Sequence, residues 1–163
     1  MEVNLPRGVC QVYIDATIPS NLVARPSQDA KVAEWQRITR EFWQDARFEF
    51  ILSDIVIDEI SAGDKEQAAS RLQVVEGFTV VVAETLEFEI AGHLIAQNAI
   101  PQSAFIDALH VAIAATHNIP YLATWNFAHL ANAYTRPRIE KVCREAGYSV
   151  PRVDSPKVIM EEL

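Results

Sequence analysis

Short apolar runs alternate with segments of helical spacing along this chain, and this alternation limits the possible folds more than any other feature. The runs Val9 to Ile14, Phe48 to Ser53, Phe78 to Val82 and Tyr121 to Thr124 have the length and character of buried strands. No two-residue hairpin signal joins them, so the strands should run parallel, with helices between them that cover both faces of the sheet. We therefore expect an α/β fold, a three-layer α/β/α sandwich around a central parallel sheet.

The segments between these runs carry apolar residues at helical spacing. The helices expected from this spacing are Ser27 to Arg47, Asp54 to Ser61, Lys65 to Glu76, Leu86 to Gln97, Ala104 to His117 and Tyr134 to Ala146. Ser27 or Asp29 should cap the first of these helices, and Ser103 should cap the helix that begins at Ala104. The two prolines between Pro151 and Leu163 predict a loosely attached C-terminal tail from about residue 151.

Length and composition fit one domain over residues 1–163. Half of the 163 residues are hydrophobic, which is enough for a single core without disulfides. Cys10 and Cys143 lack the spacing of a zinc site or a redox motif, so we expect free thiols in a reducing compartment. With no signal peptide and no apolar run long enough to cross a bilayer, we expect a soluble cytoplasmic protein without a membrane partner.

Polar side chains follow several of the expected strands. Asp15 comes directly after the first strand, Glu59 lies one to two helical turns beyond the second, and Asn126 follows Thr124 after one residue. Ligand sites in open parallel sheets form outside the carboxyl ends of the strands. These residues should therefore share one rim of the sheet.

Asp107 is a candidate for a different reason. It stands in the first turn of a helix that is apolar nearly all round, and such a helix is buried. An ionised carboxylate there needs a partner, and the nearby sequence offers His110 but no lysine or arginine, so we expect a cation as the partner.

Oxygen ligands without cysteine match Mg²⁺ or Mn²⁺, whose natural chemistry is phosphodiester hydrolysis. The net charge of -8 argues against nucleic-acid binding by bulk attraction, unless some of the acids surround such cations. Each acid also has an ordinary structural interpretation: Asp15 as a turn-former or helix cap, Glu59 as a solvated helix residue, and Asp107 as a partner of the helix dipole.

Four segments occur in an order and spacing that match a known family. They are the strand and acid at 12–17, the segment at 52–60, the helix start at 107–114 and the loop at 124–130. Together they resemble the PIN-domain ribonucleases, and among these the VapC-type toxins of bacterial toxin–antitoxin pairs.

The resemblance implies Mg²⁺- or Mn²⁺-dependent cleavage of single-stranded or structured RNA, with the metal held by Asp15, Glu59 and Asp107. Asp58 is the less favoured neighbour of Glu59. Asn126 stands where the family often has a fourth acid, and it counts with Thr124 among the expected catalytic residues. Thr124 and Thr17 resemble hydroxyl positions that line the site, whereas Ala16 stands where a threonine is common.

The resemblance also implies partners. An RNA substrate, a cognate antitoxin protein and a homodimer are expected, since small PIN toxins commonly dimerise. The amphipathic segments Leu86 to Gln97 and Ala30 to Ala46 offer more apolar surface than one small sheet can cover.

The histidines and the late basic residues have mainly structural interpretations. His93, His110, His117 and His129 include no pair at i, i+4, so a histidine metal site is not predicted. We expect His110 to be a core residue. For His129, a hydrogen bond within the site loop and a purely structural role are equally expected. The stripe of Arg138, Lys141 and Arg144, extended by Arg136, is more typical of a solvated face than of an RNA track.

Other functions fit less well. A haloacid-dehalogenase-like phosphatase needs a second acid where Thr17 stands, and a receiver domain needs a paired acidic cluster and a late lysine. The remaining alternative is a degenerate PIN domain that binds RNA or protein, with Asn126 as the sign of lost chemistry.

Overall fold

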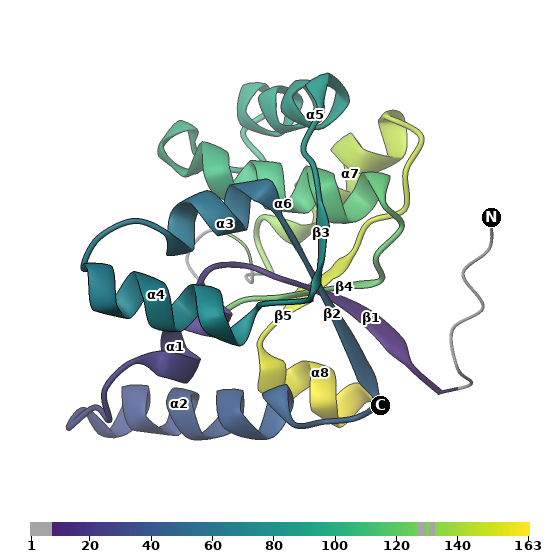
Figure 1. Cartoon of the computed structure of the whole chain (residues 1–163). Helices are drawn as coiled ribbons and strands as arrows, with labels where there is room; N and C mark the ends of the chain where they lie inside the picture. Colours follow the sequence, from purple (N-terminus) through teal and green to yellow (C-terminus); the bar gives the residue numbers. More distant parts are fainter. Residues whose placement is uncertain (1–7, 127–129, 131–132) are drawn as a thin grey trace.

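The structure is a computed structural model that describes residues 8–126, 130 and 133–163. Within these residues a parallel sheet has the strand order β3-β2-β1-β4-β5. The strands are β1 (Cys10–Ile14), β2 (Phe48–Ser53), β3 (Thr79–Val81), β4 (Tyr121–Ala123) and β5 (Arg152–Asp154). Helices lie on both sides of the sheet, with α2 (Ala30–Trp43) and α8 (Pro156–Glu162) below it and α5 (Thr85–Ala96), α6 (Phe105–Thr116) and α7 (Arg136–Glu145) above it in Figure 1. The predicted three-layer α/β/α architecture is therefore confirmed.

Six of the helices match predicted segments, with shifts at their ends, whereas no helix was predicted at residues 17–23 or 156–162, where the structure has one. They are α1 (Thr17–Val23), α2 (Ala30–Trp43), α3 (Asp54–Ile60), α4 (Lys65–Val74), α5 (Thr85–Ala96), α6 (Phe105–Thr116), α7 (Arg136–Glu145) and α8 (Pro156–Glu162). Asp29 caps α2 by accepting hydrogen bonds from the backbone nitrogens of Lys31 and Val32. No described helix is both long enough and apolar enough to span a membrane.

The prediction that Ser103 caps α6 is wrong. After Pro101, which has an extended backbone, residues Gln102–Ala104 form a 3₁₀ turn that leads directly into α6. Ser103 lies inside this turn, and α6 begins at Phe105 without a side-chain cap.

The prediction of a loosely attached C-terminal tail is also wrong. Strand β5 pairs in parallel with β4, with Val153 opposite Leu122, and the side chain of Ile159 in α8 is fully buried. Both prolines stand where no backbone N–H is needed: Pro151 directly precedes β5, and Pro156 is in the first turn of α8. The tail therefore forms an edge strand and a covering helix.

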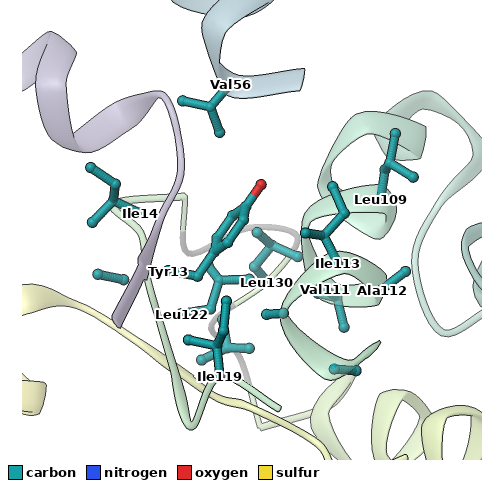
Figure 2. Close-up of a cluster of buried hydrophobic side chains, with 14 of the residues drawn as sticks. Tyr13, Ile14, Val56, Leu109, Val111, Ala112, Ile113, Ile119, Leu122 and Leu130 are labelled. Carbon is teal, nitrogen blue, oxygen red and sulfur yellow. The ribbon is translucent and has the colours of Figure 1, made fainter. Parts of the chain in front are cut away.

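The centre of the core is β1, which has neighbours on both sides. Val12, Tyr13 and Ile14 are fully buried, as expected of a parallel strand that is covered on both faces. Figure 2 shows the Tyr13 ring among side chains that include Leu122 and Ile113, with its hydroxyl directed toward the side of Val56.

The strand order reverses at β1. The chain proceeds from β1 to β2 and β3 in one direction, and β4 then pairs with the opposite side of β1. In open α/β sheets, ligands bind outside the carboxyl ends of the strands at such a reversal. The topology thus points to the ends of β1 and β4.

Candidate active site

Asp15 lies at this reversal, immediately after β1. The register pairs Ile14 with Ala123, so the next residues of the two strands, Asp15 and Thr124, are neighbours. The Oδ2 atom of Asp15 accepts a hydrogen bond from the Thr124 hydroxyl, and its Oδ1 atom accepts from both the backbone nitrogen and the hydroxyl of Thr17. Only 2% of Asp15 is exposed to solvent.

The same two threonine hydroxyls also hold the loop that follows β4. The Thr17 hydroxyl accepts a hydrogen bond from the backbone nitrogen of Trp125 at 3.0 Å, and the Thr124 hydroxyl accepts one from that of Asn126 at 2.9 Å. Each hydroxyl donates to Asp15 and accepts from the loop. The loop is therefore positioned relative to the Asp15 carboxylate.

The electrostatic environment of Asp15 is unusual for a carboxylate. Burial raises the pKa of Asp15 above its ordinary value, and the electrostatic influence of nearby His110 and the hydrogen bonds from Thr124 and Thr17 offset this only in part. An ionised Asp15 is thus held in surroundings that favour an added positive charge.

Asp107 reaches this network from α6. The residues Ala108 to Ala115 are buried, as predicted from their composition, whereas Asp107 in the first turn is half-buried. Its Oδ2 atom accepts a hydrogen bond of 2.9 Å from the side-chain nitrogen of Asn126. Asn126 is a protein partner for Asp107 that the nearby sequence did not reveal.

Glu59 is connected to the same helix through His110. The Oε1 atom of Glu59 lies 2.6 Å from Nε2 of His110, whose Nδ1 atom lies 2.7 Å from the hydroxyl of Tyr13. The Tyr13 hydroxyl lies 2.8 Å from Oγ of Ser53. His110 is 1% exposed, which agrees with its predicted place in the core, and the Glu59 side chain is 35% exposed.

The structure thus brings all three predicted acids to one end of the sheet. Asp15 is joined to Asp107 through Thr124 and Asn126, and Glu59 contacts His110, which lies one helical turn after Asp107 on α6.

The ligand types at this end of the sheet suit Mg²⁺ or Mn²⁺, since carboxylate, hydroxyl and amide oxygens are present without a thiol. Among the described residues, however, no three His, Cys, Asp or Glu side chains lie close enough together to hold a metal ion. Asp15, Glu59 and Asp107 each contact a hydrogen-bonding group of the protein instead. The residues thus fit the ion in the kind of ligand atom they offer. That the three share a cation stays a prediction.

Sequence reasoning missed the participation of Tyr13 and Ser53. From the sequence, both are taken only as parts of buried strands, although each places a hydroxyl in a mainly apolar run. The predicted site loop is described only in part, because His129 lies outside the described residues.

The late basic residues behave mostly as a solvated face. Lys141 and Arg144 are exposed and form ion pairs with Glu145 and Glu140 on the same helix. Arg138 donates to the backbone oxygen of Asn98. These contacts agree with the structural interpretation of the stripe.

Comparisons with known proteins bear on this site. The family model described as PIN domain matches residues 12–131, a span that contains Asp15, Glu59, Asp107 and Asn126. A search of curated proteins by sequence found no significant match.

Two solved structures have a similar fold. The first is Mycobacterium tuberculosis VapC20, a sarcin-ricin loop cleaving toxin, with a TM-score of 0.55 and 14% identity over 74% of this chain and 98% of that one. The second is VapBC2 from Rickettsia felis bound to a promoter DNA fragment, with a TM-score of 0.53 and 15% identity over 89% of this chain and 98% of that one.

Proposed function

The chain belongs to the PIN domain family, and from that premise we propose that it is a metal-dependent endoribonuclease, the toxin of a toxin–antitoxin pair. The observation that carries the proposal is Asp15, buried where the strand order reverses and linked through Thr124 and Asn126 to Asp107. Its proposed substrate is RNA, single-stranded or in a structured loop. The similarity in fold to a toxin that cleaves the sarcin-ricin loop supports this substrate class.

In this proposal Asp15, Glu59 and Asp107 hold Mg²⁺ or Mn²⁺. A cation bound there would lower the pKa of a water molecule for attack on the phosphodiester and neutralise the phosphate oxygens. Thr17 and Thr124 keep Asp15 in one orientation, and the Asn126 amide orients Asp107. With a net charge of -8, the protein repels RNA overall, so cation binding at the acids would also aid the approach of substrate.

A cleavage assay tests this proposal. The parent protein should cleave RNA with Mg²⁺ or Mn²⁺, and EDTA should abolish cleavage. Asp15→Asn and Asp107→Asn should each remove most activity while circular dichroism shows a folded protein, because each substitution deletes one charge and keeps the side-chain shape. Asp58→Asn is the matched control, since Asp58 is an exposed acid next to Glu59, and it should keep most activity.

Three results would count against the proposal. Cleavage that persists in EDTA, or in Asp107→Asn, would contradict a metal-dependent reaction at this site. Joint loss of folding and cleavage in Asp107→Asn would mean that the carboxylate is structural. A parent protein that binds RNA without cleaving it would favour the degenerate binding module instead.

We also propose a cognate antitoxin, a homodimer and a cytoplasmic location. The toxin–antitoxin complex among the similar structures supports the first of these. For the dimer, Leu86 and Phe88 at the start of α5 and Ile106 of α6 are large hydrophobic residues that remain exposed. Helix α2, the other predicted source of surplus apolar surface, contacts α1 and α8 and has none of the large exposed hydrophobic side chains of the described residues.

Light scattering tests the homodimer. The parent should have the mass of a dimer at micromolar concentration, and Phe88→Glu should have that of a monomer, because a charge on an apolar interface opposes association. A monomeric parent at high micromolar concentration would contradict the homodimer.

A further inference from the structure

We propose that His110 is a positioning residue for Glu59, and that Tyr13 and Ser53 in turn orient His110. The inference rests on the proposed function, in which Glu59 is a metal ligand. The contacts themselves are buried: His110 is 1% exposed, and Tyr13 and Ser53 are fully buried.

The chemistry of the four groups determines the direction of their hydrogen bonds. An ionised carboxylate only accepts, so the hydrogen between His110 and Glu59 belongs to Nε2 of His110, whether the ring is neutral or charged. In the neutral ring, Nδ1 then lacks a hydrogen and accepts from the Tyr13 hydroxyl.

Ser53 completes the chain at its other end. Its Oγ atom accepts a hydrogen bond from the backbone nitrogen of Val56 at 3.3 Å, as the cap of α3. Its own hydrogen is then directed to the Tyr13 oxygen, which already donates to His110. Every donor in the series Ser53, Tyr13, His110 and Glu59 therefore has an acceptor, which is the condition for a stable buried polar network.

This arrangement attaches a mobile side chain to a rigid part of the core. Glu59 has a long side chain that is 35% exposed, and such a side chain samples several rotamers unless it is held. His110 is held by α6 and by Tyr13 of the central strand, with a ring-centroid distance of 5.6 Å between the two rings. The hydrogen bond from Nε2 restricts Glu59 to one orientation before a cation arrives.

With Oε1 held by His110, Glu59 would present its carboxylate to a cation in one orientation. Groups that orient metal ligands in this way contribute strongly to metal affinity, and their removal typically weakens it by about 10-fold to 100-fold.

The first experiment measures Mn²⁺ affinity by calorimetry, without substrate. His110→Phe keeps an aromatic ring of similar size but removes the donor, and should weaken binding by about 10-fold or more. His110→Gln keeps an N–H donor and should restore much of the affinity. Tyr13→Phe should weaken binding to a smaller extent, and its matched control, Tyr121→Phe on the neighbouring strand β4, should bind as the parent does.

The second experiment needs no metal. In the metal-free parent, a hydrogen-bonded Nε2–H of His110 should exchange slowly with water and give an NMR signal. Glu59→Ala removes the acceptor and should abolish or shift that signal. A merely space-filling histidine would show neither the signal nor its dependence on Glu59.

The outcomes separate this inference from the proposed function. Parent-like Mn²⁺ affinity in His110→Phe, or no Nε2–H signal that depends on Glu59, would overturn the positioning role and leave the nuclease proposal intact. If His110→Phe does not fold, equal affinities of Tyr13→Phe and Tyr121→Phe would overturn it. A parent that binds no Mn²⁺ would overturn the proposed function itself, and the positioning role with it.

Discussion

Single hydrogen bonds decide how the acids of this site are held. Asp15 receives three donors from two threonines, whereas Asp107 receives the side-chain nitrogen of Asn126. Asn126 therefore donates a hydrogen bond to Asp107. An ionised aspartate at the same position could not donate one. The asparagine gives the metal-free site one fewer negative charge and one more hydrogen bond than a fourth acid would.

The substitution Asn126→Asp tests this role of the amide. In EDTA it should destabilise the protein by about 1 to 3 kcal/mol, because it removes the hydrogen bond from residue 126 to Asp107 and places a second carboxylate beside Asp107. With Mn²⁺ the extra carboxylate should tighten metal binding, so the deficit in the free energy of unfolding should shrink or reverse.

Denaturant unfolding in EDTA and in Mn²⁺ measures both effects. Gln97→Glu, which adds the same charge at an exposed position on the C-cap of α5, is the control: it should cost at most about 1 kcal/mol, by the same amount in both buffers. Equal stability of Asn126→Asp and the parent in EDTA would contradict the role of the amide.

At the scale of elements, the last strand and helix are attached more firmly than their prolines suggested. Strand β5 extends the sheet beside β4, and α8 packs against α2. Arg47, in the turn between α2 and β2, donates to the backbone oxygen of Met160 in α8 and forms an ion pair with Asp45. Helix α8 is thus joined both to α2 and to the turn that follows α2.

Ile159→Ala tests the attachment of α8. Ile159 is fully buried, and its truncation should cost about 2 to 5 kcal/mol in the free energy of unfolding, as for other buried isoleucines. Lys157→Ala removes an exposed side chain from the same helix and should cost little. Similar small effects of the two substitutions would mean that α8 contributes little to the fold.

Asp45→Asn tests the turn between α2 and β2. The hydrogen bonds from Arg47 hold the pKa of Asp45 below its usual value, so its ionised form stabilises the folded state. That stabilisation is present above the unfolded-state pKa of about 3.9 and is lost as the pH falls through the lower, folded-state pKa.

We expect Asp45→Asn to be less stable than the parent by about 1 kcal/mol at pH 7, and this difference to shrink below about pH 4. Urea unfolding of both proteins between pH 3 and about pH 7 measures it. A difference that stays constant with pH would contradict the role of the carboxylate charge.

At the scale of the whole molecule, an acidic protein gathers several of its acids at one end of a parallel sheet. The net charge is -8, and Asp15, Glu59 and Asp107 all lie at the end of the sheet where the strand order reverses. A cation that binds these acids would stabilise the folded state, because the unfolded chain does not bring them to one place. Metal binding and folding stability should therefore be coupled.

Thermal unfolding with Mn²⁺ tests this coupling. At a concentration 100 times its dissociation constant, a ligand of the folded state adds about 2.7 kcal/mol, which for a chain of this size raises Tm by about 5 to 10 °C. Asp107→Asn should show a much smaller increase, and sodium chloride of equal ionic strength should not reproduce the effect in the parent. An equal rise in parent and variant would place the stabilising cation elsewhere.

Sequence alone determined the alternation of strands and helices, the parallel sheet and the acids that follow the strands. These features are local: β2 spans Phe48–Ser53 as predicted, and Ala108 to Ala115 of α6 are buried as predicted. The spacing of apolar residues that indicates a strand or a helix involves only neighbouring residues, so it can be recognised in the sequence. The family resemblance likewise rested on short segments in a given order, and the family is confirmed.

Only the tertiary structure decided which side chains meet. His110 contacts Glu59 across 51 positions of sequence, and Thr124 contacts Asp15 across 109. These pairs depend on the strand order and on the register of β1 with β4, which the packing of the whole chain selects. The attachment of α8 also depends on the packing of the whole chain, because Ile159 is buried where α8 contacts α2 and β4. Local patterns carry no information on such distant partners, and this is why the hydrogen-bond partners of the acids could not be predicted.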